Sequence, residues 1–243
     1  INSGDGDDKI SGGHGDDKIY GQSGADRIWG NEGNDAIFSG SGNDRIYAGE
    51  GDDFISSSVG DDVVYADLGN DIVTGGAGND RIKGGHGSDT ISGQNDNDMI
   101  FGESGNDTLH GNDGNDKISG GLNHDQIYGD DGADRIWGNE GNDTLSGGDG
   151  FDIIYGGLGN DLFVFTKDET DHDVIKDFTA GEDKLDLSTY LEDVGYAGFG
   201  RFALRDGYLV AFETAGGNTN VYFDHDGSGR LSGSDLICVL DDA

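Results

Sequence analysis

The sequence predicts an all-β protein: a right-handed parallel β-roll, or β-helix, of about nine turns, followed by a small β-rich C-terminal cap. Three observations support this prediction. Aspartate recurs every nine residues from Asp8 to Asp161 without an insertion, an apolar residue lies two positions after each aspartate, and glycine dominates the residues between. A nine-residue period sustained over eighteen units is typical of a solenoid of stacked, equivalent units.

Each nine-residue unit is expected to contain one short strand. Three residues centred on the apolar one can form a strand whose middle side chain points inward and whose neighbours point outward. The six remaining Gly-, Asp- and Asn-rich residues would turn the chain, because glycine adopts positive φ at little cost. Two units should complete one turn, so that residue i lies over residue i+18 and the strands pair in parallel.

Internal duplication supports this register. The segment GADRIWGNEGND occurs at residues 24–35 and again at 132–143. The offset, 132 − 24 = 108 residues, equals six units of eighteen. At about 4.8 Å per turn, nine turns would form a prism about 43 Å long.

The unit has the form G-G-x-G-x-D-x-U-x, in which U is apolar, as in residues 12–20 (GGHGDDKIY) and 75–83 (GGAGNDRIK). Over residues 3–164 this pattern resembles the nonapeptide repeat of the RTX family. The resemblance implies a β-roll in which calcium ions lie between loops of successive turns. It also implies that backbone carbonyls of the glycine-rich positions and the aspartate carboxylates hold the ions.

Charge supports a role for cations. Fifty acidic residues against fourteen basic ones give a formal net charge of −36, and stacked loops would repel one another without cations. Hard oxygen ligands in glycine-rich loops suit Ca²⁺, and nine loops on each edge allow up to about sixteen ions in the roll. The expected ligands in the roll are Asp8, Asp17, Asp26, Asp35, Asp44, Asp53, Asp62, Asp71, Asp80, Asp89, Asp98, Asp107, Asp116, Asp125, Asp134, Asp143, Asp152 and Asp161.

Some units depart from the pattern. Asp96 and Asn123 replace the fourth-position glycine, and both residue types tolerate left-handed backbone better than most. Ser57 and Ser58 replace both leading glycines of one unit. Calcium occupancy of that loop is therefore expected to be lower.

The two outward faces of the roll differ in chemistry. On the face formed by the odd-numbered units, six of nine residues before the apolar position are cationic and six of nine after it are aromatic. The opposite face has Lys18 as its only cation in these two columns. We call the first surface the basic–aromatic face, and its candidate binding residues are Lys9, Arg27, Trp29, Arg45, Tyr47, Tyr65, Arg81, Phe101, Lys117, Arg135, Trp137 and Tyr155.

This face has two interpretations. It could bind an anionic, alginate-like polysaccharide, because rings stack on sugars and arginine holds carboxylates or sulfates in bidentate geometry. The R-modules of secreted mannuronan epimerases, which the chain resembles, support this interpretation. Alternatively, the rings and cations form a structural ladder that only stabilises the roll. Nucleic acid is disfavoured, because residual negative charge opposes phosphate binding.

After Val164 the nine-residue period stops, which predicts two domains, the calcium-binding roll over 1–164 and the cap over 165–243. Residues 173–188 predict a strand, a turn at Ala180 and Gly181, and a second strand. Further strands are expected over residues 199–204, 208–212, 220–223 and 236–240. The segment DVIKDF…GEDKLDLS is similar to the cap that follows the repeats in serralysin-type proteases and epimerase R-modules.

Residues 224–235 of the cap have the spacing of a twelve-residue EF-hand loop, which predicts one further calcium ion. A solvated turn between two strands is the alternative. The expected ligands are Asp224, Asp226, Ser228, the carbonyl of Arg230 and Asp235.

No catalytic motif is present, neither H-E-x-x-H nor G-x-S-x-G, so this segment is not expected to be an enzyme. The repeats are already under way by Ser3, so we expect an upstream domain, such as an epimerase, protease or lipase. No apolar run is long enough to span a membrane, and the single cysteine excludes an intramolecular disulfide.

The RTX resemblance implies an extracellular protein exported by a type I secretion apparatus, with an uncleaved signal that the LICVLDDA ending could complete. The segment would fold when it binds calcium outside the cell, and would support secretion and stability of the upstream domain. The alternatives are a polysaccharide-binding module of a secreted enzyme and a structural segment of an RTX adhesin or toxin.

Overall fold

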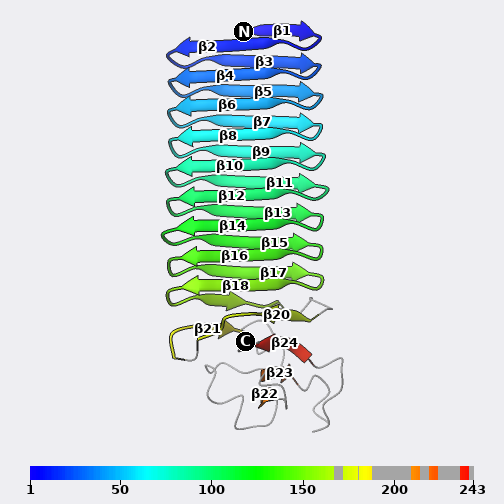
Figure 1. Cartoon of the computed structure of the whole chain (residues 1–243), viewed down its shortest axis with the longest axis vertical. Coiled ribbons are helices and arrows are strands. Elements are labelled where there is room, and N and C mark those ends of the chain that lie inside the picture. Colours follow the sequence, from blue (N-terminus) through cyan, green and yellow to red (C-terminus); the bar gives the residue numbers. More distant parts are fainter. Residues whose placement is uncertain (167–171, 180, 188–208, 214–218, 224–235, 241–243) are drawn as a thin grey trace.

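A strictly periodic burial pattern forms the strands. In a typical unit Ile28 is buried, Arg27 before it is exposed and Trp29 after it is half-buried. The computed structural model describes residues 1–166, 172–179, 181–187, 209–213, 219–223 and 236–240. Figure 1 shows the strands stacked along one axis, with the N-terminus at one end and the last strands at the other.

The strands are β1 (Asn2–Asp5), β2 (Lys9–His14), β3 (Lys18–Ser23), β4 (Arg27–Glu32), β5 (Ala36–Ser41), β6 (Arg45–Glu50), β7 (Phe54–Val59), β8 (Val63–Leu68), β9 (Ile72–Ala77), β10 (Arg81–His86), β11 (Thr90–Asn95), β12 (Met99–Ser104), β13 (Thr108–Asp113), β14 (Lys117–Leu122), β15 (Gln126–Asp131), β16 (Arg135–Glu140), β17 (Thr144–Asp149), β18 (Ile153–Leu158), β19 (Leu162–Val164), β20 (Asp173–Ile175), β21 (Lys184–Asp186), β22 (Leu209–Glu213), β23 (Thr219–Phe223) and β24 (Leu236–Leu240).

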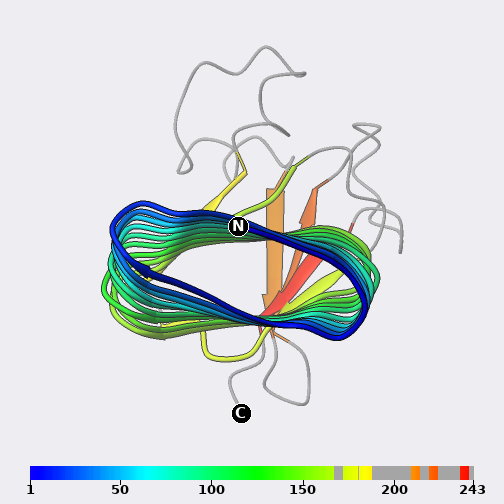
Figure 2. The same cartoon turned by 90° about the horizontal axis from the view of Figure 1, so that it is seen from above.

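The chain alternates between two parallel sheets. One contains β1 and the odd-numbered strands to β21, and the other contains β2 and the even-numbered strands to β20, extended by β24, β23 and β22. From β1 to β19 each strand pairs with the strand eighteen residues away, as in Ile28 with Ile46. Viewed along the stack, the turns superimpose as a flattened ring with the sheets as its long sides (Figure 2). The predicted parallel β-roll and its register are therefore confirmed.

The strands are longer than the sequence predicted. They span six residues instead of three, and only three residues separate consecutive strands, as between His14 and Lys18. The prediction of six-residue turns was wrong because pairing resumes after the first glycine of each unit, as in Gly13 with Asn31. Left-handed backbone at this position, with φ of 118° at Gly13, redirects the chain without ending the sheet.

One large apolar side chain per unit fills the interior, joined by Ala48 and Ala66 in two units. The column begins at Ile10, is almost completely buried through Ile154, and ends with Phe163, Phe165, Ile175 and Leu187. Since the core is only one residue deep per strand, each unit contributes little apolar surface. The loops must therefore supply a large part of the stability.

Residues other than glycine accept left-handed backbone at several positions. Asp96 and Asn123 have φ of 75° and 81°, which confirms their predicted conformation. The second glycine position is also left-handed where another residue replaces it, as at Gln94 with φ of 84°. Such positions store strain in exchange for side-chain contacts on the surface.

The roll continues beyond the recognisable repeats. β20 pairs in parallel with β18, and β21 pairs in parallel with β19, which adds a tenth turn to the nine predicted. The two strands predicted over 173–188 exist, but the expectation that they form one strand–turn–strand unit was wrong. Each strand instead extends a different sheet, because Ile175 lies over Ile154 and Leu185 lies over Phe163.

The remaining described strands are antiparallel to one another. β23 lies between β22 and β24, and β24 pairs in parallel with β20. Prediction of β24 was correct, and β22 and β23 lie within one residue of their predicted bounds. The strand predicted at 199–204 lies outside the described residues. The division at residue 164 stays a prediction, and the sheets themselves extend across it.

Replacing Gln94 with glycine should leave the free energy of unfolding unchanged or raise it by up to about 1 kcal/mol, because the strain of its left-handed backbone offsets the entropy cost of glycine. The matched control is Thr90→Gly, at an exposed strand position with ordinary φ. This change should lower the free energy of unfolding by about 1 kcal/mol. Urea unfolding at a fixed calcium concentration measures both. Equal destabilisation of the two variants would contradict the assigned backbone strain.

Candidate metal-binding loops

The repeat aspartates form two hydrogen-bonded columns, one along each edge of the roll. The backbone N–H of Asp98 donates to Oδ1 of Asp116 at 2.7 Å, and Oδ1 of Asp98 accepts the N–H of Asp80 at 2.7 Å. The same bond joins successive turns from Asp8 to Asp161. Each carboxylate is thus fixed by the turn before it.

The second carboxylate oxygen is buried without a hydrogen-bond donor in most of these aspartates. Asp98, for example, is only 1% exposed. A buried carboxylate oxygen without a donor is costly, so these atoms are candidate cation ligands. The Oδ2 atoms in this state belong to Asp8, Asp26, Asp35, Asp44, Asp53, Asp62, Asp71, Asp80, Asp89, Asp98, Asp107, Asp116, Asp125, Asp134, Asp143 and Asp161.

Oδ2 and a carbonyl oxygen from the next turn both lie against the first glycine of the unit. A methyl group built on Gly75 would lie 2.5 Å from Oδ2 of Asp80 and 2.7 Å from the carbonyl oxygen of Gly93. Any side chain at Gly75 would therefore displace these oxygens. The space inside the loop therefore favours glycine at this position, and where it is replaced the residue is small, as at Ser39, Ala48, Ser57 and Ala66.

The donor set fits calcium when backbone oxygens are included. Within the described residues, no three His, Cys, Asp or Glu side chains converge as a metal-binding group. Each loop contributes one carboxylate, so a cation would need carbonyl oxygens from the glycine-rich positions as well. Carboxylate and carbonyl oxygens are the ligands that Ca²⁺ prefers.

Burial shifts the acidity of these groups. Burial and, to a smaller extent, the negative charges of neighbouring aspartates raise the pKa of Asp62, Asp98 and Asp134 to about 8, although a backbone hydrogen bond partly opposes the shift. Without a cation, part of the column would therefore hold protons at neutral pH.

The serine-containing unit differs from its neighbours. Ser57 Oγ is buried and donates to the carbonyl oxygen of Gly75 at 2.8 Å, and Ser39 donates in the same way to the carbonyl of Ser57. These hydroxyls stand at the first position of the unit, which is Ala48 and Ala66 in the adjacent units and glycine in most others. Lower calcium occupancy of this loop stays a prediction, and the hydrogen bonds are its physical basis.

The basic–aromatic face lies on the sheet of even-numbered strands and contains stacked rings. Trp29 stacks on Tyr47 with ring centroids 5.8 Å apart, Tyr47 stacks on Tyr65 at 5.0 Å, and Trp137 on Tyr155 at 5.8 Å. The contacts of the ladder interpretation are therefore present. Since these rings cover one another, mainly their edges are available to a ligand.

The cations of this face are mostly unpaired. Among the described residues, Lys83 is the only lysine or arginine of this face in an ion pair, with Glu103. Arg81 lies over the ring of Phe101 at 4.9 Å. Lys9, Arg27 and Arg45 are exposed and follow one another in consecutive turns.

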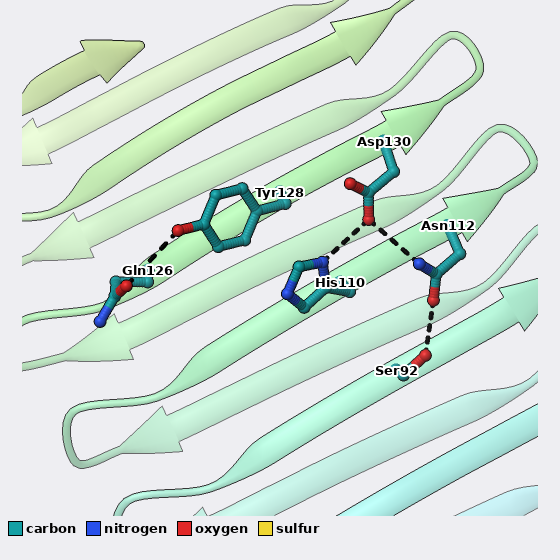
Figure 3. Close-up of polar contacts among 6 residues, drawn as sticks. All are labelled: Ser92, His110, Asn112, Gln126, Tyr128 and Asp130. Atoms are coloured by element: carbon teal, nitrogen blue, oxygen red, sulfur yellow. Dashed lines mark hydrogen bonds and ion pairs between the residues drawn. The ribbon is translucent and has the colours of Figure 1, made fainter.

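The opposite face contains a polar chain that the sequence analysis missed. His110 stacks on Tyr128 at 4.6 Å, and its Nδ1 lies 2.9 Å from Oδ2 of Asp130. Asn112 donates to the same oxygen and accepts from Ser92 (Figure 3). His110 and Asp130 are twenty residues apart, one turn plus two positions, and that spacing was the available signal.

Two further aspartates were also missed. The N–H of Asp161 donates to Oδ1 of Asp183 at 3.0 Å, and the N–H of Asp152 donates to Oδ1 of Asp173 at 3.1 Å. The available signal was an aspartate two residues before an apolar residue, Ile175 or Leu185. These aspartates follow the last repeat aspartate of their column by 21 and 22 residues instead of 18. The proposed cap ligands Asp224, Asp226, Ser228, Arg230 and Asp235 lie outside the described residues.

Comparison with known proteins identifies the repeat. A family model described as the RTX calcium-binding nonapeptide repeat matches residues 2–37, 29–64, 38–73, 65–100, 92–127, 101–136 and 128–163. The chain belongs to the RTX calcium-binding repeat family. The matches end at residue 163, so they do not include the tenth turn of this RTX chain.

Among solved structures, the RTX chain is similar to the AlgE6R3 subunit of the mannuronan C5-epimerase from Azotobacter vinelandii. The two share 30% identity over 52% of this chain and 70% of that one, with a TM-score of 0.38. No curated protein matches the chain. In the described part of the chain, no helix is long and apolar enough to cross a membrane.

Acid should promote metal-free folding. The pKa of Asp62, Asp98 and Asp134 rises from 3.8 to about 8 on folding, mainly through burial, so the folded chain binds more protons than the unfolded chain between about pH 4 and pH 8. Stability without calcium therefore falls as pH rises through this window. Circular dichroism in calcium-free buffer should show more β-structure at pH 5 than at pH 8. The opposite order would contradict the burial of these carboxyls.

Proposed function

We propose that this chain is a calcium-dependent folding module of a secreted protein, exported by a type I apparatus and ordered only after it reaches calcium outside the cell. The buried, unpartnered Oδ2 atoms of the aspartate columns carry the proposal. The family match supports calcium as the ligand. Each repeat aspartate would bind calcium together with backbone carbonyls of neighbouring loops.

The energies favour coupled folding and binding. Each buried, ionised carboxylate costs several kcal/mol unless it is paired. A folded domain has a net stability of only about 5–15 kcal/mol, so two columns of such groups would outweigh the core at neutral pH. Calcium removes this cost in the folded state alone, and its binding free energy becomes folding free energy.

The same balance would serve export. In a cell interior with little free calcium, a chain of net charge −36 would stay unfolded and could pass through a secretion channel. Extracellular calcium modules bind in the range of about 0.1 to 1 mM, which suits folding outside the cell. Folded next to an upstream domain, the roll would stabilise it. A further calcium ion in the loop at 224–235 belongs to this proposal.

A single central aspartate tests the role of the columns. Asp98→Asn keeps the oxygen that accepts the Asp80 N–H and removes one charge. We expect the free energy of unfolding with calcium bound to fall by about 3 kcal/mol, as when one partner of a buried charge pair is removed. The calcium concentration at the folding midpoint, followed by circular dichroism, should rise. Asp113→Asn, at an exposed position, is the control and should match the unmodified chain. If the two variants titrate alike, or the unmodified chain is folded in chelator at neutral pH, the proposal fails.

The second candidate function is binding of an anionic polysaccharide at the basic–aromatic face. The observation in its favour is the run of Lys9, Arg27 and Arg45, three like charges in consecutive turns without a carboxylate partner in the described part of the chain. Like charges opposite one another destabilise a sheet, so an anionic ligand would relieve this repulsion. The stacked rings would then contribute edges and the outer ring faces of each stack.

Calorimetric titration with short uronate oligosaccharides at saturating calcium tests this candidate. We expect about micromolar binding by the unmodified chain, and none when Arg27, Arg45, Arg81 and Arg135 are changed to glutamine. The control adds the same charge to the opposite face by changing Thr90, Thr108, Gln126 and Thr144 to glutamate, and it should still bind. Absence of heat with the unmodified chain would leave the face a structural ladder, as in an RTX adhesin or toxin segment.

A further inference from the structure

The tenth turn repeats the loop geometry of the calcium-binding units although its sequence lacks their period. In the repeats, the N–H of Asp143 donates to Oδ1 of Asp161 at 2.9 Å, and the N–H of Leu162 donates to the carbonyl of Asp143 at 2.8 Å. One turn later, Asp161 donates to Asp183 at 3.0 Å, and Lys184 donates to Asp161 at 2.8 Å. Asp183 thus occupies the position of a repeat aspartate.

The residues before Asp183 also match a repeat. Gly181, Glu182 and Asp183 form a G-x-D sequence, as Gly159, Asn160 and Asp161 do one turn earlier. Gly181 has φ of 99°, so it is left-handed like Gly159, with φ of 146°. The four extra residues of this turn precede the glycine and leave the end of the loop unchanged.

Asp177 holds the longer loop against the preceding turn. Its Oδ1 accepts the N–H of Gly156 at 2.8 Å and its Oδ2 accepts the N–H of Gly157 at 3.0 Å. Gly156 also borders the carboxylate of Asp161, since a methyl group built on it would lie 2.5 Å from Oδ2 of Asp161. Asp177 therefore positions the tenth-turn loop beside the last repeat aspartate.

The last repeat aspartate has an oxygen that the described residues leave without a donor. Asp161 is 1% exposed, and its Oδ2 accepts no hydrogen bond. In Asp183 both oxygens accept backbone N–H groups, from Asp161 and from Thr179 at 2.7 Å. A carboxylate oxygen keeps a second lone pair after one such bond, so Asp183 can still bind a cation.

We propose that Asp161 and Asp183, with backbone carbonyls of their two G-x-D loops, form an additional calcium site between the ninth and tenth turns. Nine repeat loops on this edge leave eight positions for calcium between successive loops, and the new site would be a ninth. It would also join the repeats to the segment that follows them. This inference rests on the proposed calcium-dependent function. The tenth turn would then bind metal as well as cover the end of the hydrophobic core.

Counting bound ions on the full chain tests the site. Native mass spectrometry at saturating calcium should find one ion fewer on Asp183→Asn than on the unmodified chain. The control Asp149→Asn removes the same charge at an exposed position, the end of β17, and should keep the full number of ions. If the unmodified chain binds no calcium, the proposed function fails as well. If Asp183→Asn folds and keeps every ion, only the added site is wrong, and Asp183 is a hydrogen-bonded end cap.

A second measurement does not depend on how the variant folds. Long-wavelength diffraction from calcium-loaded crystals of the unmodified chain should give an anomalous peak about 2.3–2.6 Å from oxygens of both Asp161 and Asp183. An ordered tenth turn without such a peak, alongside peaks between the other turns, would overturn the inference.

Discussion

The structure depends on one buried carboxylate in every loop. Each repeat aspartate accepts the backbone N–H of its equivalent in the preceding turn, which sets the spacing and register of the stack, and most present a second oxygen to an interior without a donor. The first interaction holds the turns together, and the second makes the metal-free stack unfavourable. Because the core contributes only one large apolar side chain per strand, it cannot outweigh that cost. The need for a cation therefore arises from the architecture itself.

The glycines and the outward residues have different parts in this arrangement. The first position of a unit accepts only glycine or a small residue, because its α-carbon packs against the carboxylate and a carbonyl, as at Gly75, whereas the second needs only left-handed backbone. Other residues therefore replace the second more freely, and their side chains build surface chemistry. Asp130 and Asn112, which bind His110 and Ser92, are examples of this use. Variation at this position changes the faces of the roll without altering the loops that would bind calcium.

Much of this could be predicted from the sequence, because the eighteen-residue register determines which residues share a column. The buried apolar column, the parallel pairing and the basic–aromatic face all follow from spacing alone. Strand length could not be predicted from spacing. It depends on the left-handed backbone at Gly13 and its equivalents, which lets strand pairing resume after the first glycine. The tenth turn did not follow either. Insertions of three and four residues move Asp173 and Asp183 out of phase, and only spatial register returns them to the columns.

The central claim is that calcium in the aspartate loops is required for the folded roll at neutral pH. Hydrogen–deuterium exchange of the full chain, with saturating calcium and with chelator, tests it most directly because it reports every repeat separately. We predict slow exchange of strand amides from β2 to β18 with calcium, and exchange close to the rate of an unfolded chain without it. Protection of these amides that persists in chelator would contradict the account, since the core and backbone bonds alone would then hold the buried carboxylates in place.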